Sequence, residues 1–460
     1  MRQQSDPRPL SAIAFASRPR IVTANASIAI ANLSQASTLG GNLDSLRGKS
    51  VLLAVTEQLL AALALIELDG IARRVVICPP DVKQDYLPGI MATGETDTIV
   101  SDSESSAFKE LTTARFVRCL PRLERNEVDR SPSHQTEWVL LTSGTTGLPK
   151  LVVHTLATLT EAFSNQQKRR EPICWSTFYD IRRYGGLQIF LRAVFRGGSL
   201  ILSDARESVA GFLIRLGENA VTHISGTPTH WRNALMSRAV DKISPGYIRL
   251  SGEIIDQPIL DSLREAYPKA NIVHAFASTE AGVAFEVTDG RAGFPADLMD
   301  RRGGAVELKI EEGSLRIRSH RAALSYLGGR SVGDEDGFVD TRDIVELRAN
   351  RYYFVGRKDG VINVGGMKVH PEEIEAVINA HPKVRMSLVK PRRSAITGAL
   401  VVAEVVLKQS GCVSDSSPDV EEIRRQIVDL CNASLPPHKT PATIRFVPSV
   451  GSAASGKMAR

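Results

Sequence analysis

Cysteine is scarce in this chain, with 5 residues in 460, and no two of them stand as Cys-x-x-Cys. An odd and sparse set argues against a disulfide scaffold and is typical of a reducing compartment, so we expect a cytoplasmic protein. Long apolar runs are also missing, because the most apolar stretch, residues 51–68, contains Glu57, Gln58 and Glu67. A membrane-spanning helix needs about 20 nearly uninterrupted apolar residues, so no membrane span is expected.

A secretory leader and a strong charge bias are absent as well. The first twenty residues contain four arginines but no apolar core, which argues against a secretory signal and leaves a transit peptide as the less favoured alternative. Basic residues exceed acidic ones by only 57 to 51, and no basic stripe is interleaved with aromatics. This balance excludes nucleic acid as an expected partner and mildly favours an anionic substrate.

The remaining composition is that of an ordinary globular protein. Hydrophobic residues make up 43% of the chain and charged residues 23%, which excludes a disordered, collagen-like or coiled-coil protein. At roughly 100–200 residues per domain, a chain of this length predicts two to four domains or subdomains.

Short apolar runs alternate with helix-length segments between about residues 50 and 290. The expected strands are residues 51–54, 75–78, 138–141, 199–202, 221–224, 247–250 and 272–276. The expected helices include residues 56–68, 156–168 and 257–267. This alternation indicates βαβ units and mostly parallel sheets.

The pattern changes after about residue 304. Short runs separated by Gly, Asp and Asn predict a small antiparallel β region at residues 306–310, 314–318, 338–340 and 352–355. Further on, the pattern predicts helices at 371–380 and 421–431 and strands at 399–407 and 443–447. We therefore predict an α/β protein with a large N-terminal domain, residues 1–357, and a small C-terminal α+β domain, residues 358–460.

The strongest chemical signal is the segment LTSGTTGLPK, residues 141–150, directly after an expected strand. Glycines let backbone N–H groups approach an anion, hydroxyls add donors, and lysine adds a positive charge. The segment therefore predicts a phosphate-binding loop, whose residues are Thr142, Ser143, Gly144, Thr145, Thr146, Gly147 and Lys150. A Ser/Thr/Gly-rich solvent loop is the alternative, which the preceding strand and Lys150 disfavour.

A second glycine-rich segment, residues 451–457, matches Gly-x-x-x-x-Gly-Lys but is not a Walker A motif. Met458 follows instead of Ser or Thr, and only three residues remain after Lys457, so no helix can follow to face a phosphate. A C-terminal loop that presents Lys457 remains open.

Polar loops of small residues also follow three other expected strands, at residues 225–228, 251–253 and 277–280. In an open parallel sheet, ligands bind outside the carboxyl ends of the strands. We therefore expect these loops and the loop after residue 141 to converge on one crevice.

Five motifs in order make the chain similar to the adenylate-forming superfamily, which comprises acyl-CoA synthetases, nonribosomal-peptide adenylation domains and luciferases. They are LLTSGTTGLPK, AFASTEAG, DTRD, GRKDGVINVGGMKVHPEEIE and SGKMAR, and the resemblance extends from about Leu46 to Lys457. It implies an N-terminal AMP-binding domain and a mobile C-terminal lid domain. It also implies ATP, Mg²⁺ and coenzyme A, or a phosphopantetheine, as cofactors.

The resemblance implies a ligase that works in two steps. A carboxylate attacks ATP to give an acyl-adenylate and pyrophosphate, and a thiol then displaces AMP. The partner is a small carboxylic acid. The acceptor thiol belongs to coenzyme A or, in the alternative, to an acyl carrier protein; the sequence does not separate these two. A non-catalytic nucleotide-binding regulator is a third alternative, disfavoured because the motif residues occur together.

Site roles follow from the resemblance position by position. The loop from Thr142 to Lys150 is expected to hold the β- and γ-phosphates, Thr279 the α-phosphate and Glu280 the magnesium ion. Phe276 is expected to stack on adenine, and Asp343 with Arg357 to contact the ribose. Asp359 is the expected hinge residue, and Gly365 with Gly366 are expected to line the thiol tunnel. Lys457 is the expected lysine of the adenylation step.

The chain departs from the family pattern at several positions. Phe276 stands where Tyr is usual, Ala277 and Arg342 stand where Gly is usual, and Lys368 replaces an Arg. Residues 178–186 lack the histidine that many relatives carry before the acyl pocket. The acid itself is not predictable from these features. Arg182 and Arg183 are weak candidates for pairing with a second carboxylate, and the aromatics Tyr179, Tyr184, Trp231 and Phe276 favour an aromatic or medium chain only slightly.

Overall fold

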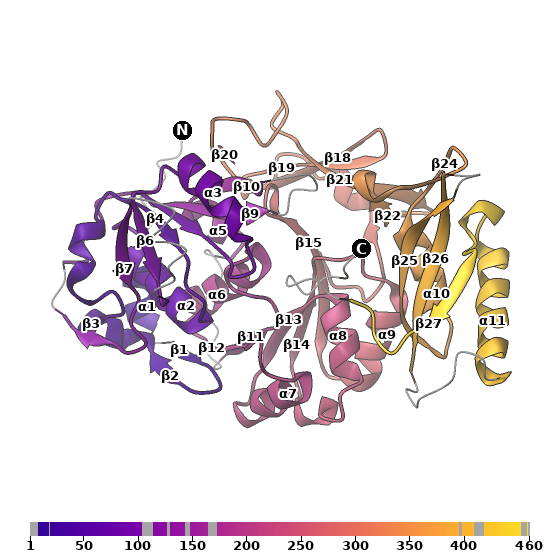
Figure 1. The fold of residues 1–460 in the computed structure, drawn as a ribbon, viewed down its shortest axis with the longest axis horizontal. Helices are drawn as coiled ribbons and strands as arrows, with labels where there is room; N and C mark the ends of the chain where they lie inside the picture. The colour runs from indigo at the N-terminus through magenta and orange to yellow at the C-terminus, as the bar shows by residue number, and fades with distance from the viewer. Residues whose placement is uncertain are drawn as a thin grey trace.

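The computed structural model describes residues 8–17, 19–103, 114–126, 129–142, 148–163, 173–394, 398–408, 418–451 and 458. Within these ranges, two large sheets and a five-stranded sheet form most of the molecule, and a three-stranded sheet lies at one end (Figure 1). This is the mixed α/β architecture that the strand–helix alternation predicts. None of the described helices combines the length and the apolar character that crossing a bilayer takes.

The first large sheet is parallel through its centre. In spatial order its eight strands are β16 (Gly282–Val287), β15 (Asn271–Ser278), β14 (Tyr247–Leu250), β13 (His223–Gly226), β11 (Cys174–Thr177), β12 (Ser199–Leu202), β1 (Arg20–Val22) and β2 (Ser27–Ala29). Pairing is parallel from β15 to β1, and the edge strands β16 and β2 are antiparallel. The carboxyl ends of β13, β14 and β15 therefore lie at one edge of this sheet.

The second large sheet carries the phosphate-loop motif. Its seven strands in order are β20 (Ser325–Tyr326), β10 (Lys150–His154), β9 (Glu137–Thr142), β5 (Arg74–Ile77), β4 (Ser50–Leu53), β6 (Thr98–Ser101) and β7 (Arg115–Arg118). β9 and β10 are antiparallel neighbours in which Thr142 pairs with Lys150. The polar loops therefore leave two different sheets, since β9 belongs to the seven-stranded sheet and β13, β14 and β15 belong to the eight-stranded sheet.

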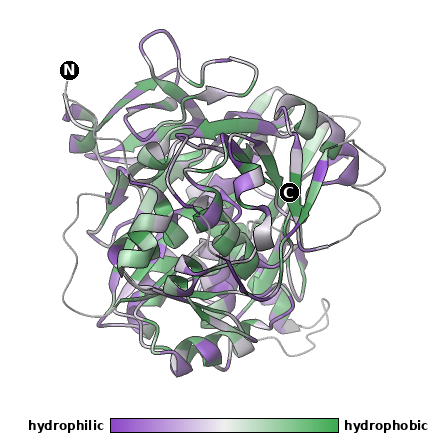
Figure 2. Cartoon of the chain, turned by 90° about the vertical axis from the view of Figure 1, so that its left-hand side faces the viewer, coloured by the Kyte–Doolittle hydropathy of each residue, from purple (hydrophilic) through white to green (hydrophobic). Residues whose placement is uncertain are grey.

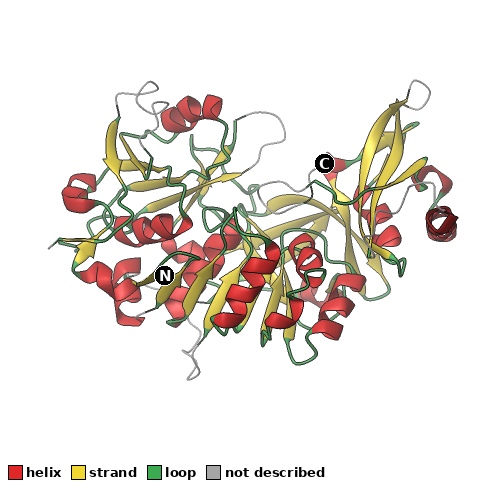
Figure 3. Cartoon of the chain, turned by 60° about the horizontal axis from the view of Figure 1, so that its bottom comes forward, coloured by secondary structure: helices red, strands yellow, loops and turns green. Residues whose placement is uncertain are grey.

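Helices fill the space between the two large sheets and cover their other faces (Figure 3). They are α1 (Leu10–Ser17), α2 (Gln58–Leu68), α3 (Leu87–Thr93), α5 (Leu156–Thr160), α6 (Tyr184–Arg196), α7 (Val209–Glu218), α8 (Pro228–Leu235) and α9 (Gln257–Ala266). α2 is apolar on all sides and is buried from Leu59 to Leu68, as a helix packed on every face must be. The largest core draws side chains from α1, α2, α6 and both large sheets.

Four smaller sheets complete the described fold. The five-stranded antiparallel sheet has the order β17 (Phe294–Pro295), β22 (Arg351–Arg357), β21 (Val339–Arg348), β19 (Ser314–Ser319) and β18 (Val306–Glu311). The C-terminal region contains β23 (Ile362–Val364), β24 (Met367–Val369), β25 (Val384–Ser394), β26 (Gly398–Leu407) and β27 (Thr443–Phe446), with α10 (Pro371–Asn379) and α11 (Pro418–Ser434). A two-stranded sheet joins β3 (Ala36–Ser37) to β8 (Glu124–Arg125).

The C-terminal region has a core of its own, made of residues from Ile362 onward. α10 and α11 contribute Ile374, Ile378, Ile423 and Ile427, which lie at helical spacing on their inner faces. In Figure 2 many strands are green, the hydrophobic end of the scale, and several helices show both green and purple residues.

Candidate nucleotide and acyl site

Six of the sequence-predicted site residues lie outside the described part of the chain: Ser143, Gly144, Thr145, Thr146, Gly147 and Lys457. The described ones lie on β9, β10, β15 and the turn after it, β21, β22, η7 and the turn between β23 and β24. They are Thr142, Lys150, Phe276, Thr279, Glu280, Asp343, Arg357, Asp359, Gly365 and Gly366.

Lys150 and Glu280 are brought together by a tyrosine. The Lys150 Nζ lies 5.2 Å from the centre of the Tyr326 ring, and the Tyr326 hydroxyl lies 3.5 Å from Glu280 Oε1. Burial, with the Glu280 charge as a second cause, raises the pKa of Tyr326 to about 12, so its hydroxyl keeps its proton at neutral pH. The structure records no ion pair between Lys150 and Glu280 in the part it describes, so the two charges flank Tyr326 without neutralising each other.

His154 holds the turn that carries Thr279. Its Nε2 lies 2.7 Å from the Thr279 carbonyl oxygen and its Nδ1 lies 3.0 Å from Thr158 Oγ1. Burial lowers the pKa of His154 to about 4, so the ring is neutral, with its proton on Nε2 where it can be donated to the carbonyl. Because residues two apart on a strand share a face, Lys150 and His154 both project from β10 toward this turn.

Backbone hydrogen bonds also hold the same turn. The Ala323 N–H donates to the Glu280 carbonyl (2.8 Å), and the neighbouring Leu324 N–H donates to the Val153 carbonyl (2.8 Å). The turn after β15 is thus fixed to β10 through both side chains and main chain, which explains how two separate sheets supply one site.

Phe276 and the predicted ribose residues are joined through β22. The Phe276 ring stacks on Phe354 with centroids 5.0 Å apart and an interplanar angle of 6°. Three residues further along β22, Arg357 stands opposite Asp343 of β21 in the antiparallel register. Directly opposed residues have Cβ atoms about 4.5–5.5 Å apart, so these two side chains are close neighbours.

The predicted hinge residue makes an ion pair with an unusual arginine. Arg342 Nη2 lies 2.6 Å from Asp359 Oδ1, and Arg342 adopts a φ of 62°, a conformation that glycine adopts far more readily than arginine does. Asp359 and Gly366 line the same surface hollow of about 580 Å³. Gly365 and Gly366 both have positive φ, at 58° and 87°.

Tyr179 belongs to the segment, residues 178–186, that lacks the expected histidine. Its hydroxyl donates to the Ser251 carbonyl at 2.7 Å and its side chain is buried. A histidine reaches this region from α8 instead, because the His230 ring stacks on Phe178 at 5.4 Å and meets Tyr179 edge-on at 5.7 Å. Burial lowers the pKa of His230 to about 4, so this ring is also neutral at pH 7.

Arg182 and Arg183 are engaged within the fold, so the idea that they receive a second carboxylate is wrong. Arg182 is buried and donates to both carboxylate oxygens of Asp180 and to the Val55 and Thr56 carbonyls. The Arg183 guanidinium binds Asp81, 2.6 Å from each carboxylate oxygen.

Met458, the residue that follows Lys457, contacts the loop after β14. Its N–H donates to Glu253 Oε1 at 2.9 Å. The Glu253 carboxylate also accepts from the N–H and the hydroxyl of Thr229 in the first turn of α8, both at 3.0 Å. Met458 therefore lies at the edge of the sheet where β13 and β14 end.

A magnesium ion fits this site only in part through protein groups. The described residues contain no cluster of three or more His, Cys, Asp or Glu side chains that would cage a metal. Mg²⁺ commonly keeps water and phosphate oxygens as ligands and takes one or two carboxylates from the protein. Glu280, at the end of β15 beside Lys150 and Tyr326, fits that limited role.

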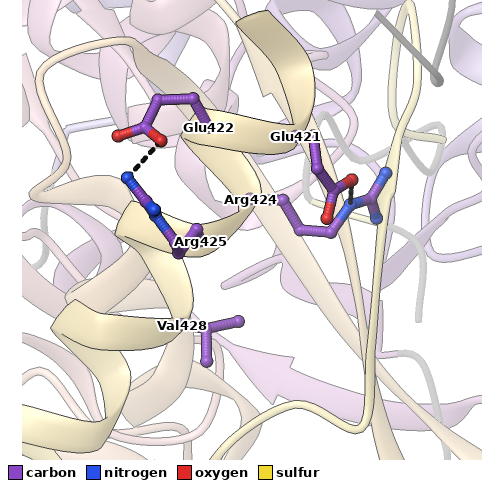
Figure 4. A pocket seen from close by; sticks show the side chains of 5 residues that line it. All are labelled: Glu421, Glu422, Arg424, Arg425 and Val428. Carbon is purple, nitrogen blue, oxygen red and sulfur yellow. Dashed lines mark hydrogen bonds and ion pairs between the residues drawn. The ribbon is translucent and has the colours of Figure 1, made fainter. Parts of the chain in front are cut away.

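A hollow of about 530 Å³ beside α11 does not form part of the site (Figure 4). Its charged side chains all come from one helix and pair with each other: Arg424 with Glu421 at 3.0 Å and Arg425 with Glu422 at 2.5 Å. These exposed pairs at i,i+3 spacing are ordinary surface interactions.

Several site residues escaped sequence reasoning. Tyr326 and His154 lie outside the sequence motifs, and Glu253 belongs only to one of the polar loops. One available signal was the spacing of Lys150 and His154, four residues apart with Val152 between them, since alternate residues of a strand share a face.

The buried neutral histidines predict a loss of stability in acid. His154 and His230 have a pKa of about 4 in the fold and about 6.5 when unfolded, so their contribution is complete above pH 6.5 and is lost as the pH falls toward 4. At pH 5 we expect each histidine to cost about 2 kcal/mol of unfolding free energy. Urea unfolding of wild type and His154→Gln at pH 7 and pH 5 measures this.

The variant should lose the share of the pH dependence that His154 contributes. His320→Gln, at an exposed position, is the control and should behave like wild type. Burial raises the pKa of Asp69 to about 6, which adds a slope of opposite sign, so the difference between variant and wild type is the decisive quantity. An identical pH dependence in wild type and His154→Gln would contradict the assignment.

Two models of known protein families match long stretches of this chain. The model of the AMP-binding enzyme family matches residues 63–327, and that of the AMP-binding enzyme C-terminal domain matches residues 373–457. The chain is 24% identical over 400 residues to a 4-coumarate–CoA ligase-like protein of Arabidopsis thaliana, covering 79% of this chain and 70% of that protein. It is 26% identical over 371 residues to 2-succinylbenzoate–CoA ligase of Salmonella typhimurium, covering 78% and 76%.

Solved structures agree on the fold. The anthranilate CoA ligase AuaEII in complex with anthranoyl-AMP has a TM-score of 0.81 at 18% identity and covers 100% of this chain and 97% of that one. The amide bond synthetase McbA from Marinactinospora thermotolerans has a TM-score of 0.77 at 16% identity, covering 98% and 97%. ATP-bound MatB from Rhodopseudomonas palustris has a TM-score of 0.75 at 18% identity, with the same coverage. The chain belongs to the AMP-binding enzyme family and is an adenylate-forming enzyme.

Proposed function

We propose that this enzyme activates a small carboxylic acid with ATP, releases pyrophosphate, and then transfers the acyl group from AMP to the thiol of coenzyme A. A carboxylate is a poor electrophile, and AMP is a far better leaving group than hydroxide. The curated relatives named above are CoA ligases, which supports coenzyme A as the acceptor.

The observation that carries the proposal is the cluster of Lys150, Tyr326, Glu280 and Thr279 at the end of β15. Lys150 follows the loop of residues 142–147 and supplies a positive charge for the β- and γ-phosphates. Glu280 supplies a carboxylate for Mg²⁺, which would bring charge neutralisation to the phosphates. Tyr326 keeps these opposite charges apart, so that both remain able to bind the nucleotide and its metal.

The nucleoside half of ATP is assigned to the region where β15 and β22 meet. Phe276 stacks on Phe354 and, at a longer centroid distance of 5.8 Å, on Phe285. It is still only partly buried, which suits a residue that presents part of its aromatic surface to adenine. Asp343 and Arg357, opposite each other on β21 and β22, supply an acceptor and donors for the ribose hydroxyls.

The second half-reaction is assigned to the hollow beside the hinge. Asp359 is the middle residue of the turn η7 (Lys358–Gly360), and Gly365 and Gly366 form the tight turn between β23 and β24. Without a side chain, the two glycines leave the backbone open to an extended thiol such as the pantetheine arm. Rotation of residues 358–460 about Asp359 would carry this turn to the acyl-adenylate.

Pyrophosphate release over a panel of carboxylic acids, with and without coenzyme A, tests the proposal. We expect ATP-dependent pyrophosphate release with at least one acid, and acyl-CoA formation when coenzyme A is added. Glu280→Gln keeps the shape of the side chain and removes its charge. This matched variant should therefore abolish the Mg²⁺-dependent release of pyrophosphate. No release with any acid would contradict adenylation, and discharge only by a carrier-protein phosphopantetheine would favour the carrier-loading alternative.

A further inference from the structure

Two buried arginines share one carboxylate on the inner side of the eight-stranded sheet. Arg249 of β14 and Arg192 of α6 have exposed fractions of only 4% and 6%. Arg249 Nε donates to Glu286 Oε1 at 3.2 Å, and Arg192 Nη2 reaches the same oxygen at 3.4 Å. Two cations therefore converge on a single oxygen of the β16 carboxylate.

This arrangement leaves positive charge and donors unused. The Arg192 Nε is buried and has no hydrogen-bond acceptor among the described residues. The Arg249 Nη2 is also buried; it lies 3.1 Å from Glu286 Oε1, which makes an ion pair but not a hydrogen bond of good geometry. Burial and the nearby Arg249 lower the pKa of Arg192 to about 10, which still leaves it charged at pH 7. The Phe163 ring, 4.8 Å from the Arg192 guanidinium, offers partial compensation.

An uncompensated buried cation is costly, so buried charges are normally paired. Neighbouring pairs do not supply the missing anion, since Arg321 already binds Glu161 and donates to the Val283 carbonyl at 3.0 Å. Among the residues that the structure describes, Arg192 and Arg249 therefore carry one positive charge more than Glu286 balances. An unsatisfied buried donor in a folded protein needs an explanation, and a bound anion is one.

The cluster lies on a chain of contacts that begins at the proposed reaction centre. The Thr279 carbonyl binds His154, and the His154 ring lies 5.7 Å from the buried ring of Tyr184 at the start of α6. Burial raises the pKa of Tyr184, and the charges of Arg249 and Arg192, close to its hydroxyl, act against that rise. Tyr184 thus connects the end of β15 to the two arginines on the side of the sheet that α6 covers.

We propose that the acid activated by this enzyme carries a second carboxylate, and that Arg192 and Arg249 bind this group while the first carboxylate reacts at the end of β15. This rests on the proposed function and narrows its substrate to dicarboxylic acids. Two guanidinium groups with free donors suit a carboxylate better than any neutral group, because charge-assisted hydrogen bonds are the strongest available to it. Glu286 holds the two guanidinium groups in place beside it.

The test compares α,ω-dicarboxylic acids with the methyl-ended monoacids of equal length in ATP–pyrophosphate exchange. We expect a dicarboxylic acid to be the better substrate by kcat/KM. Arg192→Gln should raise the KM of the diacid by roughly 10- to 100-fold, as expected for lost hydrogen bonds to a charged group, and should leave that of the monoacid nearly unchanged. Arg183→Gln, which removes an arginine bound to Asp81, is the matched control and should change neither value.

The comparison of the two acid series needs no variant, so the inference stays testable if Arg192→Gln fails to fold. Exchange with monoacids and none with diacids would overturn the inference and leave the proposed function standing. An equal rise in KM for both series in a folded Arg192→Gln would also overturn it, since a structural role predicts no selectivity. Failure of every acid in both series would overturn the proposed function together with this inference.

Discussion

Replacing Lys457 with alanine is expected to slow acyl-adenylate formation about 10²–10³-fold, the effect of removing one preorganised charge donor from a transition state. As the carboxylate attacks the α-phosphate, negative charge builds up on the oxygens between them, and a lysine ammonium stabilises that charge. Pyrophosphate exchange measures this step. Thioester formation from a supplied acyl-adenylate should be spared, because the lysine has no part in the attack of the thiol.

The contact made by the next residue supports this expectation. The Met458 N–H donates to Glu253, which in turn caps the start of α8 through Thr229. Glu253→Ala should therefore weaken adenylation in the same direction as Lys457→Ala. Thr229→Val removes one partner of Glu253 without touching Met458 and serves as the control. Equal loss of both half-reactions in Lys457→Ala would contradict the role assigned to the lysine.

Much of the architecture could be predicted from local pattern. Strands such as 199–202 and 247–250 coincide with β12 and β14, because short, mostly apolar, β-branched runs bounded by turns have few alternatives. The helix predicted at 257–267 is α9, which begins after the capping residue Asp256. The strand predicted at 221–224 is shifted and runs as His223–Gly226, since element ends depend on neighbouring strands as well as on the segment itself.

Other parts of the site depend on contacts that local pattern does not encode. β10 carries Lys150 and His154, but the sequence pattern does not predict it as a strand. The reason is that its sheet partners, β9 and β20, lie at very different distances along the chain. Arg249 and Glu286 are separated by 37 residues and meet only once β14, β15 and β16 pair side by side. The nucleotide residues therefore remain a prediction from motif resemblance, whereas the arginine cluster became visible only in three dimensions.

Arg342 illustrates how a departure from the family pattern gains a physical meaning. An arginine at a φ of 62° carries backbone strain that glycine would not, and a side chain there needs a compensating contact. The contact is the 2.6 Å ion pair with Asp359. Because the Arg342 side chain is half exposed, such a pair stabilises by about 1 kcal/mol at most. It would therefore bias a rotation at the proposed hinge without preventing it.

Replacing Asp359 with proline is expected to leave pyrophosphate exchange nearly unchanged and to reduce thioester formation roughly 10²-fold or more, because proline fixes φ at the proposed point of rotation of the C-terminal region. Stopped-flow mixing of acyl-adenylate with coenzyme A measures the second step by itself. Arg342→Gly is the matched control: it removes the same ion pair and relaxes the backbone, so thioester formation should change by less than about fivefold.

The two variants separate the hinge from its ion pair. If rotation about Asp359 limits the second half-reaction, Asp359→Pro is slow while Arg342→Gly is as fast as wild type or slightly faster. An unchanged thioester rate in Asp359→Pro would contradict rotation at this residue. Comparable losses in both half-reactions would instead indicate that proline disrupts β22 and the Asp343–Arg357 pairing beside it, which near-UV circular dichroism of the folded variant would reveal.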